Sequence, residues 1–203
     1  YKSNRIKVVA IFLFGITCIY FSTGANDMGE ILKFSAYHGT TKQNAESIKA
    51  NGFRTPGKIG WLGFGTYFYD RNPELAKTFA NGNFPNFPTA VLKCDIVIKQ
   101  DYVFDITDPC SKDCKEFHSC RQDIEEAIGS VNLLVKDISK PFFDARILEK
   151  ICTDKGYKMV RACTYNNNEI EREAHLHLSI SKFANGVELC LKDLNFIKQK
   201  ILL

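Results

Sequence analysis

Hydrophobic and polar residues alternate in short runs along most of the chain after residue 30. Alternation over four to eight residues is typical of a strand with one buried face. It predicts strands at 36–39, 67–69, 90–98, 102–106, 157–162, 175–181 and 187–191. Apolar residues with helical spacing instead predict helices at 41–50, 72–80, 123–129 and 143–154.

The segments between these elements carry turn and helix-end signals. Gly and Pro are frequent at 54–65 and 81–88, which we expect to be loops. Asn51-Gly52 is typical of a helix C-terminus, and Pro73 is typical of a first helical turn. Short strands mixed with short helices throughout the chain predict an α+β fold.

The first thirty residues have a different pattern. Three basic residues precede an apolar run at 8–21, and the small residues Thr23-Gly24-Ala25 follow it. This order is typical of a secretory signal peptide, and the run is shorter than the roughly 20 residues that span a bilayer comfortably. We expect residues 1–29 to be a signal peptide or membrane anchor of a secreted or membrane-anchored protein. The alternative is a core strand or helix at the edge of a cytoplasmic domain.

The composition is that of one globular domain, expected at 30–203. The chain has 203 residues, and its 16 Phe and 8 Tyr supply enough apolar surface to argue against long disorder. The net charge is +4, but three basic residues lie within the first seven positions. From residue 26 onward, 24 basic residues face 23 acidic ones. This balance argues against a polybasic nucleic-acid-binding protein, and we expect membrane contact only through the N-terminal segment.

The chain has eight cysteines, and one of them, Cys18, lies in the N-terminal apolar run. Three others lie with His118 in the segment 108–121, which we expect to be a loop. Their C-x3-C-x5-C spacing fits no common zinc finger, so we predict no metal site. Disulfides and free thiols both remain open. Secretion would favour disulfides, although seven cysteines outside the apolar run cannot all pair with one another.

The most informative stretch runs from Tyr37 to Asp70. It places the imidazole of His38 at a strand end, beside a glycine whose backbone a ligand could approach. A helix and a Gly-rich loop follow, and the loop leads into a strand that carries the ring of Tyr67. His38 alone would more often be an ordinary core or surface histidine, and Tyr67 alone ordinary strand packing. Their occurrence together favours a site for a flat ligand with hydroxyl and amide groups.

This stretch resembles a known enzyme family. The order His38-Gly39-Thr40, helix, NGF and then G-x-L-G-x-G-x-Y-F-x-D is similar to the NAD-binding half of poly(ADP-ribose) polymerase-like ADP-ribosyltransferases. These are the diphtheria-toxin-type enzymes with a His-Tyr-Glu signature. The resemblance implies an ADP-ribosyltransferase-like split β-sandwich with short flanking helices. It also implies that NAD is the co-substrate and that no metal is needed.

The resemblance implies roles for individual residues. His38 would hydrogen-bond the 2′-hydroxyl of the nicotinamide ribose. Gly39 would hold the nicotinamide amide through its backbone N–H and C=O, and Tyr67 would stack on the nicotinamide ring. Thr40 and Gly65, from the same two motifs, would also line the NAD site.

Two further residues match the family less directly. A second stacking aromatic often follows about eleven residues after the signature tyrosine. Position 78 is Thr in this chain, so Phe79 fits with a shift of one residue. Arg54, in the segment GFRTP, lies where the family often contacts the adenosine side of NAD.

The third signature residue is expected near the C-terminus. The segment NGVELCLKDLNFI, at 185–197, is similar to the family's closing pattern, with a glutamate at a strand start and alternating apolar residues after it. We assign the glutamate role to Glu188. The competing candidates lie in the charge-dense segment NEIEREAH, which we expect to be a solvated connection: Glu169, Glu171 and Glu173.

The resemblance implies an NAD-dependent ADP-ribosyltransferase that cleaves the nicotinamide–ribose bond and transfers ADP-ribose to an acceptor. The Glu188 carboxylate would stabilise the positive charge that develops on the ribose. We expect a macromolecular acceptor, protein rather than nucleic acid, and export would make the enzyme a secreted toxin or effector. The alternatives are a non-catalytic module that binds NAD or ADP-ribose, an RNA 2′-phosphotransferase-like enzyme, and a disulfide-stabilised extracellular interaction protein.

Overall fold

The computed structural model describes residues 29–54, 57–130, 140–166 and 183–203. In chain order the elements are β1 (Ile31–Thr41), α1 (Lys42–Asn51), β2 (Thr66–Asp70), α2 (Pro73–Asn83), β3 (Thr89–Lys99), η1 (Gln100–Tyr102), β4 (Val103–Asp105), α3 (Lys112–Ser130), α4 (Lys140–Lys155), β5 (Met159–Thr164), β6 (Gly186–Leu191), η2 (Leu194–Phe196) and β7 (Ile197–Leu202). Within these described ranges, no helix is long and apolar enough to cross a membrane.

Several predictions from the sequence lie outside the described residues. They are the signal peptide or anchor, of which only residue 29 is described, the strand expected at 175–181, and the competing candidates Glu169, Glu171 and Glu173.

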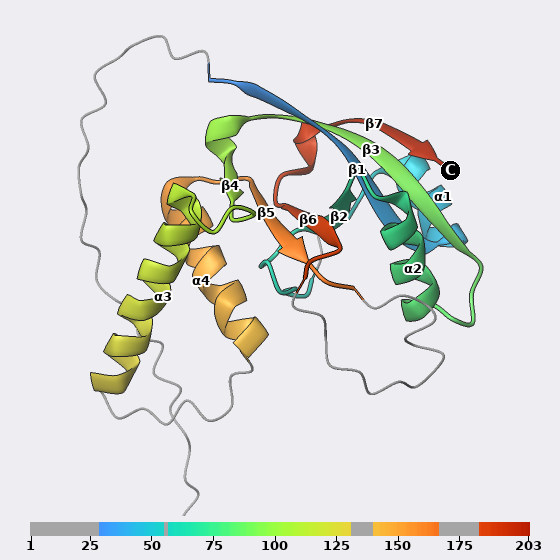
Figure 1. The fold of residues 1–203 in the computed structure, drawn as a ribbon. Coiled ribbons are helices and arrows are strands. Elements are labelled where there is room, and N and C mark those ends of the chain that lie inside the picture. Colours follow the sequence, from blue (N-terminus) through green and yellow to red (C-terminus); the bar gives the residue numbers. More distant parts are fainter. Residues whose placement is uncertain (1–28, 55–56, 131–139, 167–182) are drawn as a thin grey trace, which may run out of the picture.

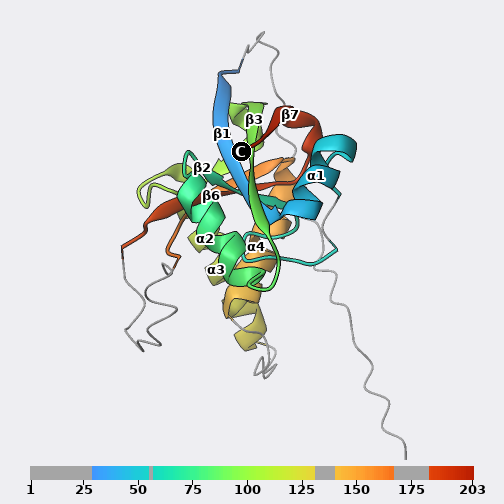
Figure 2. The same ribbon diagram turned by 90° about the vertical axis from the view of Figure 1, so that its right-hand side faces the viewer.

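Within the described residues seven strands form one open, mixed sheet, which confirms the α+β class (Figure 1). The strand order is β4-β5-β6-β2-β1-β3-β7, and every neighbouring pair is antiparallel except β4 and β5. β1 and β3 pair along their whole length, from Ile31 opposite Lys99 to Thr41 opposite Thr89. α1 and α2 lie on opposite faces of this long pair, as the turned view in Figure 2 shows.

Apolar residues with strand and helix periodicity build two main core clusters. In β3 every second residue from Leu92 to Ile98 is buried, and this row packs with Phe68 of β2 and Ala45 of α1. The second cluster joins α4 to the β4–β5–β6 part of the sheet. Its members include Phe104, Ile147, Leu148, Ile151 and Val160. The first cluster continues across the sheet to Met159 of β5, whose neighbour Val160 belongs to the second cluster, so the two clusters lie on opposite faces of the β4–β5–β6 part.

Local capping signals place α1 and α2 as the sequence predicts. Thr41 caps α1, since its hydroxyl accepts a hydrogen bond from the backbone N–H of Asn44 at 3.2 Å. Gly52 ends α1 with a φ of 84°, a conformation that favours glycine. Asn72 caps α2 in the same manner, with the N–H of Leu75 3.0 Å from its Oδ1.

Four parts of the chain differ from the sequence prediction. β1 covers Ile31–Thr41, whereas the sequence predicts a strand only at 36–39. The segment 108–121 is largely helical, because α3 begins at Lys112. The Ser111 hydroxyl accepts a hydrogen bond from the backbone N–H of Cys114 at 3.0 Å, as a helix cap does. Cys114 and Phe117 are both buried, three residues apart, so this cysteine serves as an apolar residue on a packed helix face. In addition, α2 continues beyond its predicted end at residue 80, and β7 was not predicted.

The seven cysteines in the described residues are all free thiols, so the disulfides considered from the sequence are not found among them. Burial raises the pKa of Cys94 to about 12, of Cys152 to about 12 and of Cys190 to about 11. Thiols in such surroundings stay protonated and behave as small apolar side chains. In the described part of the chain, no group of three or more His, Cys, Asp or Glu side chains could hold a metal ion.

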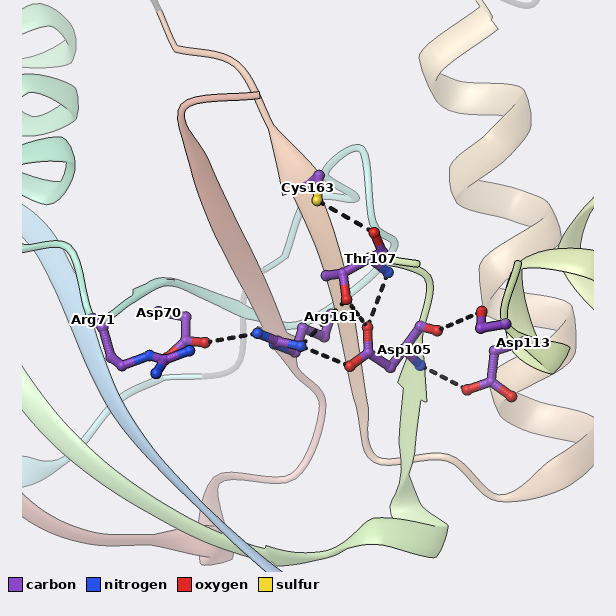
Figure 3. Close-up of polar contacts among 8 residues, drawn as sticks. Asp70, Arg71, Asp105, Thr107, Asp113, Arg161 and Cys163 are labelled. Atoms are coloured by element: carbon purple, nitrogen blue, oxygen red, sulfur yellow. Dashed lines mark hydrogen bonds and ion pairs between the residues drawn. The ribbon is translucent and has the colours of Figure 1, made fainter. Parts of the chain in front are cut away.

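A partly buried ionic network ties the middle of the sheet to its β4 edge (Figure 3). The guanidinium of Arg161, on β5, donates to Asp70 of β2 at 3.2 Å and to Asp105 of β4 at 2.8 Å. Burial disfavours the charged form of Asp105, but hydrogen bonds from Thr107 and Arg161 outweigh it and lower the pKa of Asp105. Because Asp70 is also where β2 pairs with β1, the network fixes the strand end beside the site described next.

Candidate functional site

A cleft opens in the middle of the sheet, where β1 and β2 part. The two strands pair only at Ala36 opposite Asp70 and at Tyr37 opposite Tyr69. Beyond Tyr37, β1 stays with β3 while β2 stays with β6. The cleft has a volume of about 1180 Å³, which is ample for a dinucleotide-sized ligand. It is lined by every site residue that the sequence predicts, namely His38, Gly39, Thr40, Arg54, Gly65, Tyr67, Phe79 and Glu188.

The backbone N–H and C=O of Gly39 face this opening and have no partner on β2. In antiparallel strands the N–H and C=O of one residue point to the same side, and that side alternates along the strand. The Ser35 carbonyl accepts a hydrogen bond from the Arg71 N–H at 2.8 Å, so the backbone groups of Tyr37 and Gly39 also point toward β2. Continued pairing would place Gly39 opposite Tyr67, but the β1–β2 pairing has ended there. One donor and one acceptor are therefore turned toward the cleft.

The side chain of His38 occupies the position of the next β1–β2 hydrogen bond. Its Nδ1–H donates to the backbone carbonyl of Tyr67 at 2.8 Å, which is the acceptor that the Gly39 N–H would use in continued pairing. Because a carbonyl only accepts, Nδ1 carries the proton, and Nε2 of the neutral ring is an acceptor. The rings of Phe53 and Phe68 hold the imidazole, with centroids 5.2 and 5.7 Å away. Burial lowers the pKa of His38 below its ordinary value of 6.5, and the hydrogen bond to the Tyr67 carbonyl offsets part of that shift.

The lowered pKa of His38 predicts a pH-dependent stability. As the pH falls below about 6.5, His38 binds a proton in the unfolded chain that the folded protein excludes, so the free energy of unfolding falls. We expect the His38→Asn variant, whose amide can still donate to the Tyr67 carbonyl, to lose this part of the dependence between about pH 7 and about pH 5. Urea unfolding of both proteins across this range measures the difference. Equal pH dependence in the two proteins would contradict a buried neutral ring.

Two glycines of the cleft are also required by packing. A Cβ atom at Gly39 would lie 1.8 Å from the backbone carbonyl oxygen of Ala76 on α2. A Cβ atom at Gly65 would lie 2.6 Å from Sγ of Cys190 and 2.8 Å from the carbonyl oxygen of Leu191. α2 and β6 can therefore approach the walls of the cleft only because these two positions lack side chains.

The ring of Tyr67 is fixed through its hydroxyl. The hydroxyl donates to the carbonyl of Gly63 at 2.8 Å and accepts from the N–H of Leu62 at 2.9 Å. Burial raises the pKa of this hydroxyl above its ordinary value, and the neighbouring Cys190 adds to the rise, so the group stays protonated. A ring that is held in this way needs little further ordering to stack on a flat ligand.

The carboxylate of Glu188 lies in the same cleft. β6 places Glu188 directly opposite Tyr69 of β2, and the residue is only 8% exposed. Its Oε2 accepts a hydrogen bond from Nε1 of Trp61 at 2.8 Å, and its Oε1 accepts one from Nδ2 of Asn166 at 3.3 Å. A carboxylate can accept about four hydrogen bonds, so both oxygens keep acceptor capacity for a ligand.

The remaining predicted residues lie around these three groups. Phe79, on α2, contacts the ring of Tyr69 with centroids 6.2 Å apart and is 38% exposed. Thr40 is buried, and its hydroxyl lies 3.5 Å from the side-chain amide of Asn44. Arg54 is exposed and follows α1. The cleft thus has a buried polar and aromatic interior, with a cationic side chain at an exposed position.

Trp61 and Asn166 belong to the site but were not predicted from the sequence. Trp61 is the only tryptophan of the chain and lies in the Gly-rich loop, which is a signal that could have marked it. Asn166 carries no local signal. Two hydrogen bonds with Asn185 hold this residue. The backbone N–H of Asn166 donates to Oδ1 of Asn185 at 2.9 Å, and Nδ2 of Asn185 donates to the backbone carbonyl of Asn166 at 2.7 Å.

Comparisons of the chain with protein-family models, with curated proteins and with solved structures give no match. The most specific property of the cleft is that pairing of β1, β2 and β6 brings His38 and Tyr67 together in it with Glu188, far away in the sequence.

Proposed function

We propose that the protein is an NAD-dependent ADP-ribosyltransferase, which cleaves the nicotinamide–ribose bond and transfers ADP-ribose to an acceptor. One observation carries the proposal. A cleft in the sheet is lined by the unpaired backbone of Gly39, the fixed ring of Tyr67 and the carboxylate of Glu188. These groups complement the amide, the aromatic ring and the ribose of a nicotinamide nucleotide.

The backbone of Gly39 would recognise the leaving group. A primary carboxamide carries both hydrogen-bond donors and an acceptor, and the N–H and C=O of one residue offer the matching pair. His38 keeps that pair available, because its Nδ1–H already occupies the Tyr67 carbonyl. Its Nε2 would accept a hydrogen bond from a ribose hydroxyl, which requires the neutral ring that burial favours.

Tyr67 and Glu188 would supply orientation and charge. The ring of Tyr67 would stack on the nicotinamide ring and hold it in line for departure. Positive charge develops on the ribose as the bond to nicotinamide breaks, and the Glu188 carboxylate would stabilise it. The same carboxylate would polarise the incoming acceptor.

We extend the proposal to the fold, as the split β-sandwich of ADP-ribosyltransferases with short flanking helices. The limited contact between β1 and β2 supports this description, because it divides the sheet into a β1–β3–β7 part and a β2–β6–β5–β4 part. The cleft lies between the two parts, with α1 and α2 packed against the first and α4 against the second.

The lining of the cleft argues against an RNA 2′-phosphotransferase-like activity. Enzymes of that kind rely on a set of arginines that contact phosphates. Among the described residues that line this cleft, Arg54 is the only arginine and Lys58 the only lysine. One or two cations suit the diphosphate that links the two riboses of NAD better than a phosphorylated RNA backbone.

Binding of NAD can be followed through Trp61, the only tryptophan, which lines the cleft. We expect NAD to change the fluorescence of Trp61 saturably in the 203-residue chain. Replacing Tyr67 by Leu, which removes the stacking ring, is expected to weaken the affinity for NAD about tenfold or more. Replacing Tyr67 by Phe, which keeps the ring and removes the hydroxyl, should cost less. Equal affinities of the two variants would contradict a stacking role, and no saturable change in wild type would overturn the NAD site.

A further inference from the structure

The Glu188 carboxylate is held by a loop and not only by its own strand. The indole N–H of Trp61 donates to Oε2 of Glu188 at 2.8 Å. Trp61 lies on the segment between α1 and β2, outside any long strand or helix. A glutamate side chain has several rotamers of similar energy, so a donor at this distance selects the ones that keep the carboxylate in the cleft. The orientation of Glu188 therefore depends on where the loop holds Trp61.

The loop is anchored from inside by the sheet. Gly60 and Gly63 form a small antiparallel bridge, with N–H to carbonyl distances of 3.1 Å in both directions. The hydroxyl of Tyr67 then bonds to the backbone of both Leu62 and Gly63. Trp61 sits between these bonded residues, so its backbone is fixed on both sides.

The same loop is anchored from outside the cleft by an ion pair. Oε1 of Glu149, on α4, accepts a hydrogen bond from the backbone N–H of Phe64 at 2.5 Å and pairs with Nζ of Lys192, which follows β6. That ammonium group also donates to the Phe64 carbonyl at 3.1 Å. A Cβ atom at Gly63 would lie 2.0 Å from Oε1 of Glu149, so the glutamate reaches the loop only because a glycine stands there. Neither Glu149 nor Lys192 lines the cleft.

We propose that Trp61 is a positioning residue for the Glu188 carboxylate, and that the Glu149–Lys192 pair positions Trp61 from outside the cleft. The expected effect of these residues on the reaction rate rests on the proposed function. Their effect on the orientation of Glu188 does not. Loss of the indole N–H removes the shorter of the two hydrogen bonds described for the carboxylate and leaves the one from Asn166, at 3.3 Å, so the carboxylate is held less firmly toward the ribose. Loss of Glu149 removes the acceptor of the Phe64 backbone N–H, so the loop no longer holds Trp61 in place. The hydrogen bond from Trp61 to Glu188 is then weakened as well.

The geometric part is tested without activity. The protein has a single tryptophan, so a nitrogen-15-labelled sample gives one indole N–H signal in its NMR spectrum. We expect this signal to shift in Glu188→Gln, because a carboxylate acceptor is replaced by an amide, and to shift or broaden in Glu149→Ala. The control is Glu116→Ala, which removes the carboxylate paired with Lys155 between α3 and α4. It should leave the signal unchanged.

The kinetic part is a double-mutant cycle with nicotinamide release as the readout. Trp61→Phe, which keeps an aromatic ring, should lower kcat about tenfold, and Glu149→Ala about fivefold, with smaller changes in KM for NAD. Because Glu149 acts through Trp61, the double variant should resemble Trp61→Phe, about tenfold below wild type rather than about fiftyfold. Glu116→Ala, combined with Trp61→Phe in the same way, should add nothing.

The two experiments separate the inference from the proposed function. If the indole N–H signal of Trp61 is unchanged in both Glu188→Gln and Glu149→Ala, the inference is overturned, whatever the enzymatic activity of the protein. Independent kinetic effects that multiply to about fiftyfold also overturn it. Wild-type protein that releases no nicotinamide, but whose indole signal responds to both variants, contradicts the proposed function and leaves the positioning of Glu188 intact.

Discussion

The Glu188→Gln variant is expected to release nicotinamide from NAD about 10²- to 10³-fold more slowly than the wild-type protein, in the range for loss of one preorganised electrostatic group. Gln has nearly the same shape, and its amide still occupies the space between Trp61 and Asn166. What it lacks is the negative charge opposite the developing positive charge of the ribose. The loss should therefore appear in kcat, while the affinity for NAD stays within about threefold.

A matched control separates this effect from a general loss of acidic charge. Glu74, at the start of α2, is exposed and does not line the cleft. Glu74→Gln should release nicotinamide at the wild-type rate. A Glu188→Gln variant as active as Glu74→Gln would contradict the catalytic role of Glu188. A rise in KM with an unchanged kcat would assign Glu188 to binding alone.

The Gly39→Ala variant is expected to lose about 3 kcal/mol or more of its free energy of unfolding, because overpacking against backbone cannot be relieved by a rotamer change. The new methyl group would lie 1.8 Å from the carbonyl oxygen of Ala76 and 3.1 Å from Cβ of Ala80. Either α2 moves away from β1 or the strand shifts, and both displace the backbone that faces the cleft. Urea unfolding followed by circular dichroism measures the loss.

Gly129 offers the control for this substitution. It lies in α3, and a Cβ atom there would meet no atom within 4 Å. Gly129→Ala should leave the protein as stable as wild type or stabilise it by up to about 1 kcal/mol, the difference in helix propensity. Trimming Ala80 to Gly should not rescue Gly39→Ala, since the closest clash is with a backbone oxygen. A Gly39→Ala protein with wild-type stability would contradict the packing of α2 on β1.

The parts of the fold with strong local signals could be predicted from the sequence. The caps Thr41 and Asn72 and the terminal Gly52 mark α1 and α2 closely, because each acts on the backbone of its own neighbours. The alternation in β3 likewise reflects one buried face, whereas β6 is buried on both faces from Glu188 to Leu191. The residues that the family resemblance singles out, His38, Tyr67 and Glu188, lie in one cleft because pairing of β1, β2 and β6 brings them together.

Other parts depend on contacts that no local pattern encodes. Cysteines in the segment 108–121 suggested a loop, yet in the folded protein Cys114 is an apolar residue of a helix that packs toward α4. β7 is a polar edge strand that gains its structure from pairing with β3. The hydrogen bond from Trp61 to Glu188 and the ion pair of Glu149 with Lys192 join residues that are distant in the sequence. No local sequence pattern could therefore predict either contact.

The most direct test of the proposed activity is to incubate the 203-residue chain with NAD and to separate free nicotinamide from NAD by chromatography over time. We expect nicotinamide to appear in wild-type samples, alone or with added protein acceptor, and its appearance to slow sharply in Glu188→Gln. NAD that binds saturably but stays intact in both samples, with and without acceptor, would contradict a transferase and favour a module that only binds the nucleotide. Absence of both binding and cleavage would contradict the NAD site itself.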